Sequence, residues 1–115
     1  MMYALLIYET EEQFASRNDP DLAPEYWASW QAFSEAIAEV NTSGAALQGP
    51  TTATAVAVRG GERQVQDGPF PDAKEHLGGF FLIDVPDLDT ALEWASRAPN
   101  AATSTTEVRP LLEMG

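Results

Sequence analysis

Two segments of the chain are apolar on both of the faces that a β-strand presents. Residues 2–8 and 80–85 carry apolar side chains at successive positions, with Asp84 as the one charged interruption. In an antiparallel sheet with one solvated face, apolar and polar residues alternate instead. Burying each large apolar side chain is worth about 1.5–3 kcal/mol. We therefore expect both faces of this sheet to be covered. In the first segment, one face carries Tyr3, Leu5 and Ile7 and the other carries Ala4, Leu6 and Tyr8. In the second segment, one face carries Phe81, Ile83 and Val85 and the other carries Phe80 and Leu82.

The pattern from Pro24 to about Ser43 predicts a helix that covers one of these faces. Its apolar residues are spaced as one face of a helix requires. They are Tyr26, Trp30, Phe33, Ile37 and Val40. Gly44 would end the helix, and residues 9–23 before it are expected to form a polar loop. We expect the aromatic stripe to pack in the core, with the lining of a ligand cavity as the alternative. Trp27 lies beside the stripe and is expected to face a partner or a pocket.

Short sequence motifs predict the remaining strands and the second helix. Extended runs at 45–47, 53–59 and 62–67 include a Gly60-Gly61 link, which predicts a β-hairpin because both turn positions need positive φ. Strands are expected at 77–85 and at about 105–111. Asp87 is the expected N-cap of a second helix that Ala98-Pro99 ends. The inner face of that helix is expected to be Leu88, Ala91, Leu92 and Ala95.

The order of these elements predicts an α+β fold in one domain of residues 1–115. Two helices that alternate with a small antiparallel sheet follow the ferredoxin-like plan, in which both helices pack on one face. No third helix is expected to cover the other face. We therefore predict a homodimer through the sheet face, in which two sheets form a dimeric α/β barrel.

The charge of the chain excludes several partners. Six Lys and Arg residues stand against 18 Asp and Glu, which gives a formal net charge of −12. Nucleic acids and anionic membranes need clustered cations, and the six are scattered along the chain. The short apolar N-terminal segment lacks the features of a signal peptide or a membrane span. The chain has no cysteine, which fits a cytoplasmic location and excludes disulfides and thiolate chemistry.

One segment, residues 67–79, gathers the residue types that carry chemistry. His76 is the only histidine, and its ordinary pKa suits proton transfer near neutral pH. We predict His76 as the base of a catalytic site and Asp67 as the residue that orients it. The alternative is structural: Asp67 forms the turn and His76 ends a loop. Tyr8, Trp27, Phe70, Lys74 and Arg109 are the predicted ligand contacts.

Several motifs in and around this segment resemble the DGPF-domain branch of the YCII-related family. The matching stretches are Asp67-Gly68-Pro69-Phe70, Lys74-Glu75-His76-Leu77-Gly78-Gly79-Phe80 and Ile83-Asp84-Val85-Pro86-Asp87-Leu88-Asp89, together with 3–8 and 107–110. The resemblance implies a ferredoxin-like domain that forms a dimeric α/β barrel, in agreement with the sheet argument. It also implies a bacterial protein and, for relatives in this branch, association with extracytoplasmic-function sigma factors.

The catalytic pair of the wider family does not carry over to this chain. Some members resemble small hydrolases or dehalogenases, with a His on the first helix and an Asp after the second. Here the first predicted helix contains no His, and Asn100 stands after the second helix. Two hypotheses remain: a small-molecule binding domain or enzyme, with a pocket between the first helix and the sheet or at the dimer seam, and a non-catalytic regulatory module. We expect no cofactor and no metal, since one His and no Cys leave a single chain without a conventional ligand set.

Overall fold

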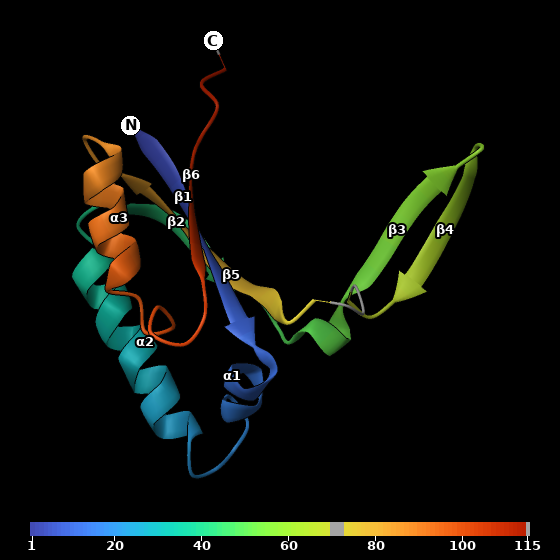
Figure 1. The fold of residues 1–115 in the computed structure, drawn as a ribbon, viewed down its shortest axis with the longest axis horizontal. Helices are drawn as coiled ribbons and strands as arrows, with labels where there is room; N and C mark the ends of the chain where they lie inside the picture. Colours follow the sequence, from blue (N-terminus) through green and yellow to red (C-terminus); the bar gives the residue numbers. More distant parts are fainter. Residues whose placement is uncertain (70–72, 115) are drawn as a thin grey trace.

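The computed structural model of the chain describes residues 1–69 and 73–114. Its main sheet has four antiparallel strands in the order β2-β5-β1-β6. They are β1 (Met2–Thr10), β2 (Asn41–Ala46), β5 (Glu75–Asp84) and β6 (Thr106–Pro110). Helices α2 (Ala23–Ile37) and α3 (Leu88–Ser96) lie on one face of this sheet (Figure 1). The predicted ferredoxin-like arrangement, with both long helices on one face, is confirmed. None of the helices that the structure describes is long and apolar enough to span a membrane.

The core lies between this sheet and the two helices. Leu5, Ile37 and Ile83 are completely buried there, from β1, α2 and β5 respectively. Strand β1 turns its odd-numbered residues toward the helices, because successive side chains of a strand point to opposite faces. This alternation continues to Glu9, a charged residue at the end of the buried face.

The opposite face of the sheet stays partly exposed in the single chain. Leu6 and Tyr8 of β1 and Phe80 and Leu82 of β5 are all half-buried. Leu6 pairs with Phe80 in the register, so these side chains form one apolar surface that neither helix reaches. The sequence predicted such a surface from the lack of alternation.

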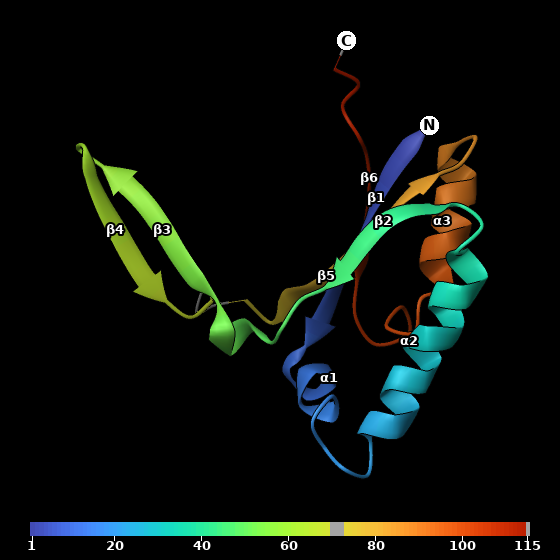
Figure 2. The same ribbon diagram turned by 180° about the vertical axis from the view of Figure 1, so that it is seen from behind.

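A second, two-stranded sheet projects from the body of the fold (Figures 1 and 2). It consists of β3 (Thr54–Arg59) and β4 (Glu62–Asp67), preceded by the short 3-10 helix η1 (Pro50–Thr52). Gly60 and Gly61 join the strands with φ angles of 59° and 81°, so the hairpin predicted at this link is confirmed. Val56 pairs with Val65, and both are more than half exposed.

The first long helix is shorter than its predicted range. It ends at Ile37, and Asn41–Ala46 form β2 instead of a last helical turn. Gly44 does not stop a helix: it lies in β2, where a Cβ atom would be 2.5 Å from the carbonyl oxygen of Phe80. The prediction was wrong because pairing with β5, which is remote in sequence, outweighs the helical spacing of Val40.

The predicted loop at 9–23 was also wrong in part. Residues Glu9 and Thr10 continue β1, and α1 (Glu11–Ser16) follows. Thr10 Oγ1 accepts a hydrogen bond from the Gln13 amide, and the Gln13 side chain accepts one from the Thr10 amide. This capping box, Thr-x-x-Gln, is a sequence signature that predicts a helix start. The sequence analysis overlooked this signature because Glu9, Glu11 and Glu12 made the segment look like a polar loop.

Helix α3 begins as predicted but packs differently. Asp87 Oδ1 accepts a hydrogen bond of 2.9 Å from the Thr90 amide, which confirms the N-cap. Ala91 and Ala95 are buried, whereas Leu88 and Leu92 are about half exposed. The expected inner face was therefore wrong in part: Ala91 and Ala95 are the buried positions, and Trp94 also packs against the core.

Candidate functional site

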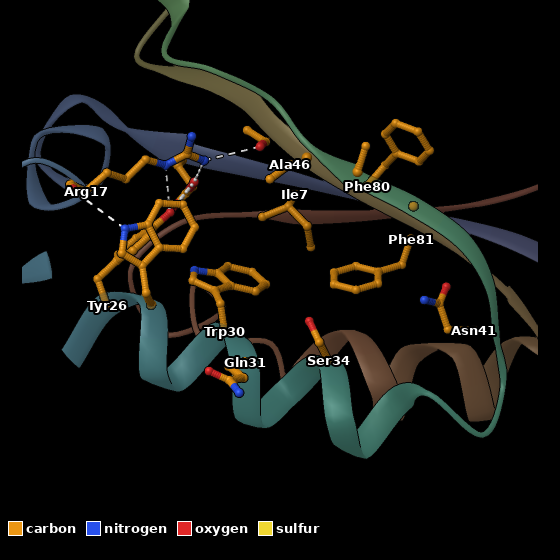
Figure 3. A pocket seen from close by; sticks show the side chains of 16 residues that line it. Ile7, Arg17, Tyr26, Trp30, Gln31, Ser34, Asn41, Ala46, Phe80 and Phe81 are labelled. Carbon is orange, nitrogen blue, oxygen red and sulfur yellow. Dashed lines mark hydrogen bonds and ion pairs between the residues drawn. The ribbon is translucent and has the colours of Figure 1, made fainter. Parts of the chain in front are cut away.

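A cavity of about 510 Å³ lies between α2 and strands β2 and β5 (Figure 3). Helix α2 contributes Trp27 and Trp30, and β5 contributes Phe81. Gly44 and Gly79 line the strand side. This volume lies in the range of small-molecule sites in proteins.

The middle of the cavity has an aromatic wall. The rings of Trp30 and Phe81 are within 17° of parallel, and their centroids are 6.4 Å apart. Phe33 packs behind them, edge-on to both rings. Such a flat apolar surface suits a planar ligand, since ring stacking and apolar burial both favour it.

One end of the cavity is polar and is built around Glu9. This side chain is only 1% exposed, and Arg17 Nη2 donates a hydrogen bond of 2.8 Å to its Oε1. The Tyr26 hydroxyl lies 2.7 Å from Oε2 and donates its proton to the same carboxylate. Arg17 Nε in turn donates to the Tyr26 hydroxyl oxygen at 3.0 Å. We call these three residues the Glu9 cluster.

Arg17 also contacts three residues outside the cluster. Its guanidinium donates to the carbonyl oxygens of Leu47 and Gly78, and it lies 4.7 Å above the ring of Phe14 from α1. The backbone of Gly78 is close to the cluster, since a Cβ atom there would be 2.6 Å from Glu9 Oε1. The Glu9 cluster thus lies close to the backbone at Gly78, and β2 lies close to it at Gly79.

The electrostatics of the cluster keep both polar partners of Glu9 in their protonated forms. Burial, with the hydrogen bond to Glu9, raises the pKa of Tyr26 to about 12. Burial by itself would lower the pKa of Arg17, but the hydrogen bonds to Tyr26 and Glu9 outweigh it and raise that pKa. At neutral pH the phenol is therefore a hydrogen-bond donor and the guanidinium a cation. The raised pKa of the phenol favours a role as hydrogen-bond donor over a role as base.

The predicted site residues are distributed over several parts of the molecule. Trp27 lines the cavity and is 43% exposed. Tyr8 points to the opposite face of the sheet. Lys74 is exposed just before β5, and Arg109 is exposed on β6 in an ion pair of 3.1 Å with Glu107. Phe70 lies outside the described residues.

The structure does not bring the predicted catalytic pair into contact. His76 is half-buried in β5, opposite Glu9 in the register, and Asp67 is exposed at the end of β4. Among the residues described, no hydrogen bond joins the two side chains, and neither lines the cavity. Their catalytic roles stay a prediction.

Sequence reasoning missed Glu9, Arg17 and Tyr26 as a group. One signal could have found the first of them. Glu9 continues the spacing of Tyr3, Leu5 and Ile7, so it lies on the buried face of its strand. A carboxylate on a buried face needs a cation and hydrogen-bond donors. Nothing local in the sequence identifies Arg17 and Tyr26 as those partners.

Asn100 stands where the family resemblance has its Asp, and the structure gives it a structural role. The side chain is completely buried, and its Nδ2 donates to the carbonyl oxygens of Tyr8 and Thr105. Its Oδ1 accepts from the Thr106 hydroxyl. The amide thereby joins the start of β6 to β1. Over the described ranges, no group of three or more His, Cys, Asp or Glu side chains could hold a metal ion.

Comparisons with known proteins place this fold among relatives. The whole chain, residues 1–115, matches the YCII-related domain. An uncharacterized protein of Rhizobium meliloti (strain 1021) is 51% identical over 65 residues, which are 54% of this chain and 52% of that protein. The matched region thus spans about half the length of that relative. The solved structure of 5-chloro-2-hydroxyhydroquinone dehydrochlorinase from Burkholderia phenoliruptrix AC1100, in complex with 2,5-dihydroxybenzoquinone, is also similar. Its TM-score is 0.60 at 14% identity, over 99% of this chain and 96% of that one, and this likeness shows the fold.

Proposed function

This chain belongs to the YCII-related family, and from that premise we propose that it binds a small planar molecule in the cavity between α2 and strands β2 and β5. The observation that carries the proposal is the cavity itself: about 510 Å³, with the Trp30–Phe81 wall along it and the Glu9 cluster at one end. Apolar walls with a few fixed polar groups are what small-molecule sites require.

Two further observations support a planar ligand. Trp27 is a large apolar side chain left 43% exposed at the rim of the cavity, where a ring could cover it. The similar dehydrochlorinase structure holds 2,5-dihydroxybenzoquinone, which is a planar ring. This agreement concerns the size and shape of a ligand, and no reaction is transferred with it.

The proposal is tested by filling the cavity. Ser34 lies on the cavity side of α2, so Ser34→Phe places a ring where the ligand would lie. We expect planar aromatic compounds such as 2-naphthol to raise the melting temperature of the unmodified protein, because a ligand that binds only the folded state stabilises it. The Ser34→Phe variant should lose this shift. Ser29→Phe is the matched control, since Ser29 is exposed on the same helix away from the cavity. A shift that survives in Ser34→Phe would contradict the proposal.

We also propose that two copies associate through the exposed face of the sheet. Leu6, Phe80 and Leu82 leave an apolar surface there that neither α2 nor α3 covers. The β3–β4 hairpin supports this proposal, because an isolated two-stranded hairpin is only marginally stable in water. Light scattering should give the mass of a dimer at micromolar concentration, and Leu82→Glu should give that of a monomer. A monomer before substitution contradicts the proposal.

Association with a sigma factor, the regulatory alternative, rests on the family resemblance alone. Its test is co-expression with an extracytoplasmic-function sigma factor. Failure of the two proteins to co-purify would exclude it.

A further inference from the structure

The β3–β4 hairpin has an apolar face that the single chain leaves in contact with water. Val56 pairs with Val65, and Val58 stands two residues further along β3, so the three side chains lie on the same face. Val56 is 65% exposed, Val58 61% and Val65 56%. A two-stranded hairpin needs packing against another part of a protein to be stable in water. Among the described residues, this face has no such packing.

The hairpin, which we call the arm, makes the single chain less compact than its length predicts. The radius of gyration is 15.9 Å, whereas a compact chain of this length has about 13 Å. At the base of the arm, the Gly68 amide donates a hydrogen bond of 2.6 Å to the carbonyl oxygen of Ala53. The strands thus stay joined down to the point where they leave the body. The arm is a formed element that extends away from its own core.

The arm projects on the side of the main sheet that the helices leave free. In Figures 1 and 2, α2 and α3 lie on one side of the four-stranded sheet, and the arm extends on the other side. The molecule measures 48 × 44 × 20 Å, and Figure 1 looks along its shortest axis, so this view shows most of the arrangement. The exposed sheet face of Leu6, Phe80 and Leu82 points to the side of the arm, since neither helix covers it. A second copy on that sheet face would therefore lie beside the arm.

The charge of the arm also suits a second copy of the chain. Residues 54–67 include two Arg, one Glu and one Asp, so the arm has a formal net charge of zero and the rest of the chain carries the whole −12. A neutral apolar arm approaches another acidic body without the repulsion that two acidic bodies exert on each other. Arg59 and Arg63, next to the turn, are attracted to such a body.

We propose that each arm packs its face of Val56, Val58 and Val65 against the body of a second copy. The contact is reciprocal, because a twofold homodimer uses the same surface of both subunits. This inference rests on the proposed association through the sheet face, which brings the second copy within reach of the arm. The sheet faces and the two arms then form one continuous interface, which removes the apolar side chains of both from water.

Two substitutions that add the same charge compare the two faces of the arm. Val56→Lys places a cation on the valine face, and Gln64→Lys places one on the opposite face of the same hairpin. Burying a valine is favourable and burying an unpaired charge is not. We therefore expect Val56→Lys to raise the dissociation constant of the dimer at least about tenfold, and Gln64→Lys to change it less than about threefold. Light scattering over a series of protein concentrations measures both. Equal effects of the two substitutions would overturn the inference.

A spin label on the arm gives a second test that needs no change to the valine face. The chain has no cysteine, so Gln64→Cys provides a single attachment point for a nitroxide. Spin-labelled chains are mixed with isotope-labelled unmodified chains, so that every broadened NMR signal reports a contact between copies. We expect broadening of amide signals from the body of the isotope-labelled copy. No broadening in a protein with the mass of a dimer would overturn the inference and leave the proposed association intact. The mass of a monomer would contradict both.

Discussion

Two ion pairs of the same chemical type occupy contrasting regions of this molecule. Glu9 and Arg17 are 2.8 Å apart, with side chains 2% and 10% exposed, at the junction of β1, α1 and α2. Glu107 and Arg109 are 3.1 Å apart on β6, with side chains 42% and 70% exposed. The first pair has a phenol and two backbone carbonyls as further partners, whereas the side chains of the second pair are exposed. Both pairs consist of a Glu and an Arg, so residue type alone does not distinguish them. Their burial and their further partners make only the first pair part of a candidate site.

The largest expected difference between the two regions is in the free energy of unfolding that is lost when the arginine of each pair is replaced. Arg17→Met leaves Glu9 buried without its cation, and breaking a buried pair in this way costs about 3–5 kcal/mol of unfolding free energy. Arg109→Met is the matched control, because exposed pairs contribute about 0–1 kcal/mol. Urea denaturation of both variants measures the difference. Equal losses would show that the Glu9 cluster has no special stability.

Removing the hydroxyl of Tyr26 is expected to lower the stability of the protein by a smaller amount. Tyr26→Phe keeps the ring but withdraws a hydrogen bond from a charged, buried partner, which costs about 1.5–3 kcal/mol. Tyr8→Phe is the control, since Tyr8 lies on the other face of the sheet. Urea denaturation is again the measurement. A loss no greater than that of the control would indicate that water replaces the phenol.

The same variant also tests the pH dependence of the cluster. Burial and Glu9 raise the pKa of Tyr26 from 10.0 to about 12, so the folded protein keeps the phenolic proton where the unfolded chain loses it. This contribution to stability is complete below pH 10 and is lost as the pH rises toward about 12. We expect the difference in melting temperature between the unmodified protein and Tyr26→Phe to shrink between about pH 10 and about pH 12. A constant difference would contradict the raised pKa.

A smaller effect is expected where the cluster meets β5. In Gly78→Ala the new Cβ would lie 2.6 Å from Glu9 Oε1 and 3.1 Å from Arg17 Nη2. Overpacking of this kind costs about 1–3 kcal/mol. Gly49→Ala is the control, because a Cβ at Gly49 meets no atom closer than 4.0 Å and its φ is −60°. Thermal unfolding compares the two. Equal melting temperatures would show that the cluster adjusts without cost.

The smallest effect is expected at the segment that the sequence favoured. His76→Ala should leave binding of 2-naphthol in the cavity unchanged within about twofold, because His76 is not among the lining residues. Titration followed by NMR of the indole N–H signals of Trp27 and Trp30 measures this, because both residues line the cavity. A loss of binding in His76→Ala would favour the predicted His76–Asp67 site over the cavity.

The sequence predicted well those features that depend on neighbouring residues. The Gly60-Gly61 turn, the Asp87 cap and the two-faced β1 each follow from a few adjacent positions. It failed where a remote segment decides the outcome. The end of α2 and the role of Gly44 depend on pairing with β5, which lies more than 30 residues further along the chain.

The candidate site shows the same division. Trp27 was predicted as a site residue because it is a large aromatic residue that lies beside the apolar stripe of its own helix. Arg17 and Tyr26 were not, because their burial exists only once α1 and α2 meet the end of β1. The His76 segment, by contrast, gathers suggestive residues along the sequence that the fold does not bring together around a described cavity.

The sequence by itself determined the α+β plan, the two apolar faces of β1 and the hairpin at Gly60-Gly61, since spacing and turn chemistry act over a few residues. Only the tertiary structure decided which charges are buried and which aromatic rings line a cavity. The physical reason is that a carboxylate such as Glu9 is stable inside the protein only when a cation and hydrogen-bond donors from other segments surround it. The final packing alone brings those segments together.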